Sequence, residues 1–266
     1  MGACRPAFFS RIFPEFSNFV RICREVHGME ASIPREIFFM NFDLTPFFAE
    51  YEALAAQTDA LFQRVSGDFS AEVRCCQGCS DCCHALFDVT LVEALYLNAK
   101  FLLLDEALRN EILIAADKAD RRAHVLKKKA SREAEERPHE EILTGVAKER
   151  LRCPLLDQND QCRLYAFRPV TCRVYGIPLE IGGASRTCGL SGFAPGRAYP
   201  AVKLERVQDR LLGLSNRLLD ALGSPYPDFR MMYVPVSTAL MTVYSDEYFG
   251  LGSGSGQPDT VEAENA

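Results

Sequence analysis

The chain has 266 residues, of which 48% are hydrophobic and 25% charged, a composition typical of folded globular proteins that excludes wholesale disorder. The 30 Lys and Arg residues against 36 Asp and Glu residues give a net charge of −6, which excludes a generally basic nucleic-acid-binding protein. Cysteine is the anomaly, with 11 residues beside only 4 His and no Trp.

Residues 1–42 are rich in Phe and are predicted to be an N-terminal extension. One hypothesis is that translation begins at Met29 or Met40, and the alternative is an amphipathic helix at the N-terminus. The arginines of this segment leave no long apolar run, so neither a secretory signal nor a membrane span is expected. We therefore expect a cytoplasmic protein without a membrane partner.

Four amphipathic helices follow from the spacing of apolar residues. The first begins at Thr45, expected to cap it, and ends near Gly67. Thr90 and Glu93 predict a capping box for the second. The third starts at Asp105, and the fourth covers 204–222.

The remaining segments give weaker signals. A shorter helix is expected from Pro138 to about Arg150. Segment 151–200 lacks helical periodicity, and the turn at 157–160 suggests a small hairpin flanked by cysteines. The tail from about 250 is Gly/Ser-rich, then acidic, and is expected to be disordered. The expected fold is mainly α, with one domain at 43–249 around an irregular cysteine-rich region.

The third helix carries a basic run followed at once by acidic residues. A nucleic-acid surface would need aromatic side chains interleaved with the basic ones for base stacking, and none are present. The acidic block also cancels much of the positive field. A solvated helix face is therefore the favoured interpretation, and no nucleic-acid partner is expected.

Nine cysteines fall into two groups, one within residues 75–83 and the other within residues 153–188. Disulfides, metal ligands and reactive thiols compete as explanations. Disulfides require an oxidising compartment, whereas closely spaced thiols in a reducing cytoplasm favour metal binding. The grouped cysteines are Cys75, Cys76, Cys79, Cys82, Cys83, Cys153, Cys162, Cys172 and Cys188.

The spacing Cys76-x2-Cys79-x2-Cys82-Cys83 is typical of zinc and iron–sulfur sites, because a two-residue gap lets two thiolates converge on one ion. Gly78 would relieve the sharp turn of such a loop. Adjacent Cys82 and Cys83 are expected to point in different directions and to serve different ions. Thiolates alone fit zinc and iron–sulfur equally well. His84 is a further candidate ligand or a surface residue.

These residues resemble the YkgJ-type cysteine-cluster family, called CxxCxxCC and described as a zinc- or iron-chelating domain. The resemblance covers roughly 70–190 and includes the motifs Cys162-Arg163-Leu164-Tyr165 and Arg168-Pro169-x2-Cys172-Arg173. It implies eight metal-associated cysteines and leaves Cys75 as an extra. The implied ligands are Cys76, Cys79, Cys82, Cys83, Cys153, Cys162, Cys172 and Cys188.

Arg168 and Arg173 would stabilise the negative charge of thiolates nearby, or they serve as ordinary structural ion pairs. The main hypothesis is a metal-binding protein that holds zinc or an iron–sulfur cluster for a structural, metal-handling or redox role. The alternative is a cluster-dependent protein-modifying enzyme, since flagellin lysine N-methylases carry a similar motif. A redox sensor that releases zinc on thiol oxidation is a third hypothesis. A protein partner is compatible with each of them.

Overall fold

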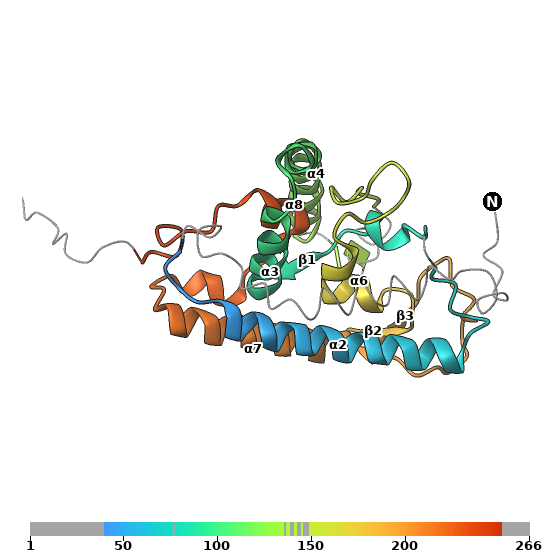
Figure 1. The fold of residues 1–266 in the computed structure, drawn as a ribbon. Helices are drawn as coiled ribbons and strands as arrows, with labels where there is room; N and C mark the ends of the chain where they lie inside the picture. Colours follow the sequence, from blue (N-terminus) through green and yellow to red (C-terminus); the bar gives the residue numbers. More distant parts are fainter. Residues whose placement is uncertain are drawn as a thin grey trace, which may run out of the picture.

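Helices dominate the computed structural model of the chain, which confirms the mainly α class (Figure 1). The structure describes residues 40–76, 78–135, 137–138, 141–142, 145 and 149–251. The helices are α2 (Thr45–Asp68), α3 (Leu91–Leu102), α4 (Glu106–Glu133), α6 (Val170–Val174), α7 (Leu204–Leu222) and α8 (Val236–Met241). The strands are β1 (Asp88–Thr90), β2 (Leu179–Ile181), β3 (Ala184–Arg186), β4 (Val202–Lys203) and β5 (Tyr233–Pro235).

The long helices α2 and α7 lie side by side and form the base of the molecule in Figure 1. Helix α3 packs on α7 and on α8, and α4 covers α8 from the opposite side. The apolar face of α7 repeats at helical spacing, and burying it against α2 and α3 provides most of its stability. Its buried residues include Val207, Leu211, Leu214, Leu218 and Leu222.

The helix ends agree with the sequence except at α2. Leu44 precedes α2 without a side-chain cap, and Asp43 Oδ1 accepts a hydrogen bond from Thr45 N at 3.0 Å. The expectation that Thr45 caps this helix is therefore wrong, because the preceding aspartate takes that role. The capping box of α3 is confirmed, and α7 ends at Gly223 with a φ of 71°.

Short strands tie the segments between the helices together. Strand β1 pairs antiparallel with β5, and β2 pairs antiparallel with β3 and parallel with β4. The segment 151–200 contains elements that the sequence did not predict, namely the 3-10 helix Tyr165–Phe167, the short helix α6 and the paired strands β2 and β3. The expected hairpin is a single antiparallel bridge between Leu156 and Cys162, which closes a tight turn.

Three apolar clusters surround the cysteine-rich region. The largest joins α2, α3 and α7, and a second joins α3 and α4 to the segment around Leu155 and Leu164. The third joins the end of α2 to α6, β2 and Phe193. Since the second and third clusters both contain residues next to cysteines, ordinary hydrophobic packing places the thiols.

Several expectations fall mostly on residues outside those described, namely the N-terminal extension, the helix after Pro138 and the acidic tail. Across the part of the chain that the structure describes, no helix is both long enough and apolar enough to cross a bilayer.

Candidate metal centre

The loop after α2 brings the first cysteine group back toward the second. Gly78 has a φ of 85°, which confirms that it allows a sharp turn that other residues rarely adopt. The chain then forms a short 3-10 helix, Asp81–His84. The N–H of Cys153 donates to the Cys83 carbonyl at 2.7 Å, and that of Leu151 donates to the His84 carbonyl at 3.0 Å. These backbone contacts place Cys153 beside Cys83.

A tight turn positions Cys162. Arg163 N donates to the Leu155 carbonyl at 2.8 Å, and the Asp157 carboxylate accepts from the N–H groups of Asn159 and Gln161, each at 2.8 Å. Leu155 and Leu164, on either side of the turn, are buried against α3 and α4. The turn is therefore anchored in the core at both ends, and Cys162 is held near Cys153.

Helix α6 contributes Cys172, and α3 fixes its position. Val170 and Val174 are fully buried on one face of α6. Val170 N donates to Glu93 Oε1 at 3.0 Å, while Glu93 Oε2 accepts from Thr90 N and from the Thr90 hydroxyl, both at 3.1 Å. The buried carboxylate of Glu93 therefore completes the capping box of α3 and also holds the start of α6, the helix that carries Cys172.

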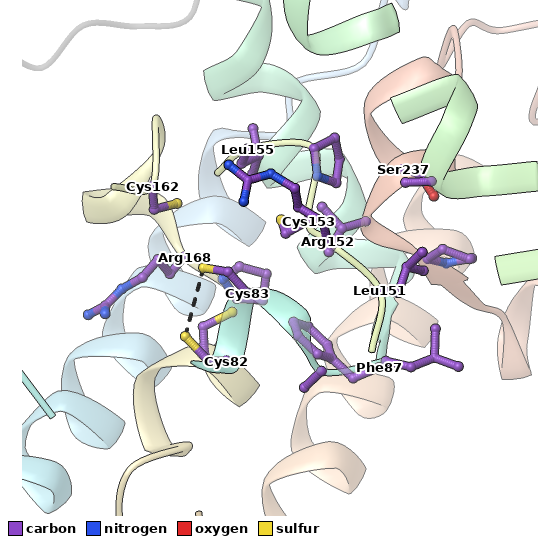
Figure 2. A pocket seen from close by; sticks show the side chains of 18 residues that line it. Cys82, Cys83, Phe87, Leu151, Arg152, Cys153, Leu155, Cys162, Arg168 and Ser237 are labelled. Atoms are coloured by element: carbon purple, nitrogen blue, oxygen red, sulfur yellow. Dashed lines mark hydrogen bonds between the residues drawn. The ribbon is translucent and has the colours of Figure 1, made fainter. Parts of the chain in front are cut away.

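Five thiols from these segments line one cavity of about 50 Å³: Cys82, Cys83, Cys153, Cys162 and Cys172 (Figure 2). The sulfurs of Cys82 and Cys83 face each other at 3.9 Å. The expectation that these two side chains point in different directions is wrong, because both sulfurs line this cavity and contact each other. The rest of the wall is mostly apolar and includes Phe87, Leu151, Leu155 and Val236.

The charge in this cavity is concentrated on one thiol. Hydrogen bonds from Cys172 and Cys83, with a further contribution from the Arg168 guanidinium, lower the pKa of Cys82. The pKa of Cys172 is raised, mainly because its S–H donates to Cys82, whereas burial raises the pKa of Cys153 and Cys162. Of the five thiols, Cys82 therefore loses its proton most readily, and the thiolate is the form in which cysteine binds metals.

The two arginines of the Arg168–Arg173 motif have different roles. Arg168 lines the thiol cavity, and its guanidinium stacks on the ring of Tyr165 at 3.6 Å. Arg173 instead pairs with Asp59 on α2 at 2.5 Å and donates to the carbonyls of Arg168 and Ala166. Arg168 thus acts on the thiols, whereas Arg173 holds α6 against α2.

A second set of thiols lies outside this cavity. Burial, and after it the neighbouring thiols of Cys79 and Cys188, raises the pKa of Cys75 to about 12. The Cys188 sulfur donates to Asp81 Oδ2 at 3.2 Å. The sequence motif leaves Cys75 as an extra and does not include Asp81. The contact with Cys188 places Asp81 beside one of the cysteines that lie outside the cavity.

Cys76 and His84 stand apart from these sets. Cys76, which the resemblance implies as a ligand, does not line the cavity, and the other eight cysteines between 75 and 188 are free thiols. The His84 ring nitrogen Nδ1 contacts the Ser80 carbonyl at 3.0 Å.

The thiols are the kind of donor that a thiophilic metal prefers. In the structure most of them are still protonated side chains that form hydrogen bonds with one another. Within the described ranges, no three His, Cys, Asp or Glu side chains already converge closely enough to hold an ion. Metal binding therefore requires the thiols to lose their protons and to close around the ion by side-chain rotation.

Residues 75–189 match the model of the CxxCxxCC family, whose description reads "Putative zinc- or iron-chelating domain". The matched segment spans both thiol sets, and the match agrees with the resemblance of the motifs. No match was found among curated proteins or among solved structures. The function class that the comparison supports is chelation of zinc or iron.

Proposed function

We propose that the protein holds one zinc or iron ion through thiolates of the cavity lined by Cys82, Cys83, Cys153, Cys162 and Cys172. The observation that carries the proposal is that five thiols from three separate segments line one small cavity. Unrelated core cysteines have no reason to meet in this way, and thiolates are the preferred donors for zinc and for iron–sulfur centres.

The sulfur spacing favours one ion over a larger cluster at this position. In a tetrahedral site with metal–sulfur bonds of about 2.3 Å, two sulfurs lie about 3.8 Å apart. Cys82 and Cys83 are 3.9 Å apart, so both can bind the same ion with little movement. In a four-iron cluster each thiolate binds its own iron, and two adjacent sulfurs this close suit that arrangement poorly.

The first role that we propose for the ion is a structural one. A bound metal would link the loop of Cys82 and Cys83, the turn of Cys162 and the helix of Cys172, none of which has a large hydrophobic core of its own. Five thiols for four tetrahedral positions leave one sulfur free to exchange with a ligand, which suits a metal-handling role. Iron at this position would add one-electron redox chemistry.

The test is metal analysis of protein purified without oxygen and under reducing conditions. We expect bound zinc or iron, and the double variant Cys83→Ser, Cys162→Ser should lose the ion of this cavity. Ser237→Ala removes a hydroxyl from the same cavity wall and should keep the metal. A colourless zinc protein would exclude iron, and a folded wild-type protein that binds neither added zinc nor added iron(II) would refute the proposal.

A further inference from the structure

We propose that the outer face of α4 is a docking surface for an acidic helix of a partner protein, which lies along α4 as in a two-stranded coiled coil. This proposal goes beyond the proposed function and does not depend on a bound metal. The outer face consists of six residues at alternating spacings of four and three: Ile114, Lys118, Arg121, Val125, Lys128 and Arg132.

The outer face lies opposite the face through which α4 packs on the rest of the protein. The buried residues of α4 follow the same alternating spacing on the other side of the helix: Ile112, Ala116, Ala119, Ala123 and Leu126. All six outer residues are exposed, and the aliphatic side chains of Ile114 and Val125 are 63% and 59% exposed. Packing within the described chain therefore does not explain why these two aliphatic residues stand in the outer row.

Charge distinguishes this face from the rest of the molecule. The chain has a net charge of −6, yet residues 118–132 contain seven basic residues and one acidic residue, Asp120. Asp120 faces α8, where it accepts hydrogen bonds from the hydroxyls of Ser237 and Thr238. Within the part of the chain that the structure describes, three basic residues of the outer face form no ion pair: Lys118, Lys128 and Arg132. Such a face is complementary to an acidic partner.

The spacing indicates the form of the partner. Alternating steps of four and three are the a and d positions of a coiled-coil seam, which a second helix covers along its length. Two copies of α4 would place basic residues against basic residues across this seam, which disfavours self-pairing. A helix that lies in a bilayer surface needs a continuous apolar face, whereas four of the six outer residues are basic.

The same helix forms one wall of the candidate metal centre. Ala119, on the inner face of α4, lines the thiol cavity together with Cys82 and Cys153. Helix α4 lies at the edge of the molecule and covers α8 (Figure 1). Because a helix is about 10 Å across, a partner on the outer face would lie one helix away from the thiols and would leave the cavity itself uncovered.

The test uses the full-length protein and synthetic helical peptides of about 21 residues, or three heptads. Each peptide carries Glu at the four seam positions that face basic residues and Leu at the two that face Ile114 and Val125. One peptide is designed for the parallel and one for the antiparallel orientation. We expect one of them to bind at least about 10-fold more tightly than a scrambled peptide of the same composition, as measured by fluorescence anisotropy.

Charge reversal tests whether the outer face is the surface that binds. Lys118→Glu, Lys128→Glu should lose binding of the Glu peptide and should gain binding of a peptide with Lys opposite these two positions. Arg64→Glu, Arg206→Glu is the matched control, because it changes the net charge equally at exposed positions on α2 and α7. The control should bind the Glu peptide within about 3-fold of the wild type. All variants are compared on samples with wild-type helical circular dichroism.

Three results would overturn the docking surface. The first is equal binding of the ordered and scrambled peptides, because a diffuse positive field then explains the affinity. The second is unchanged binding in the Lys118→Glu, Lys128→Glu variant. The third is a DNA duplex, or vesicles of phosphatidylserine and phosphatidylcholine, that displaces the peptide and binds the outer face more tightly. Wild-type protein that binds the peptide but no metal would refute only the proposed function.

Discussion

Glu93 shows at the scale of one residue how a structural contact supports the site. Its side chain is 2% exposed, and its two carboxylate oxygens accept three hydrogen bonds from Thr90 and Val170. Burial raises the pKa of Glu93, although these hydrogen bonds and the charge of Arg173 oppose the shift. The sequence indicated the bond to Thr90, whereas the bond to Val170 depends on the packing of α6.

The raised pKa leads to a pH prediction. The folded protein binds the Glu93 proton more tightly than the unfolded chain does, so this group's contribution to stability falls as pH rises from its ordinary pKa through the raised one. Glu93→Gln cannot ionise, and it also loses a hydrogen bond. We expect the wild type to be more stable than this variant at acidic pH and the difference to shrink toward pH 8.

Denaturant unfolding at several pH values measures this difference. Glu106→Gln changes an exposed carboxylate in the first turn of α4 and should leave the pH dependence of stability close to that of the wild type. A difference between wild type and Glu93→Gln that grows with pH would contradict the assignment.

At the scale of elements, the long helices follow from local sequence and the short ones from their neighbours. Helices α2, α3, α4 and α7 carry apolar residues at helical spacing and have recognisable ends. The five-residue α6 is too short to be stable alone. It exists because Val170 is buried in the cluster of α2, α3 and α7, and Val174 in the cluster at the end of α2.

The cap of α4 gives a prediction at this scale. Asp105 Oδ1 accepts a hydrogen bond from Leu108 N at 2.9 Å. Asp105→Ala should lower the free energy of unfolding by about 1 kcal/mol, because an N–H group at the helix start loses its partner. Asp117→Ala, which breaks only an exposed ion pair with Arg121, should change it by less than about 0.5 kcal/mol. Equal effects of the two variants would argue against the cap.

At the scale of the whole molecule, the helical framework and the thiol-bearing segments depend on different interactions. The largest apolar cluster joins α2, α3 and α7 and reaches the cysteine-rich region at Val170. The segment that carries Cys153, Cys162 and Cys172 packs mainly through the two smaller clusters. A metal that links the thiols should therefore stabilise this segment much more than it stabilises the framework.

Removal of the metal tests this division. We expect a chelator to lower Tm by several degrees, because the ion binds the folded state and not the unfolded one. Hydrogen exchange should become faster in residues 151–192 and change little in α7. Helical circular dichroism should persist. Uniform loss of protection across the chain would show that the framework itself depends on the metal.

The sequence by itself determined the helical class, the four long helices and the presence of a thiol-based metal motif, because each of these is a local pattern of spacing or composition. Only the tertiary structure decided which thiols meet. Cys82 and Cys83 line one cavity with cysteines that are 70 or more residues away in the sequence, and backbone pairing brings Cys153 to Cys83. Cys188 contacts Asp81, and its loop is held against the end of α2 by the bond from Gly192 N to the Glu72 carbonyl. Which cysteines meet depends on long-range packing, and residue spacing along the chain does not predict it.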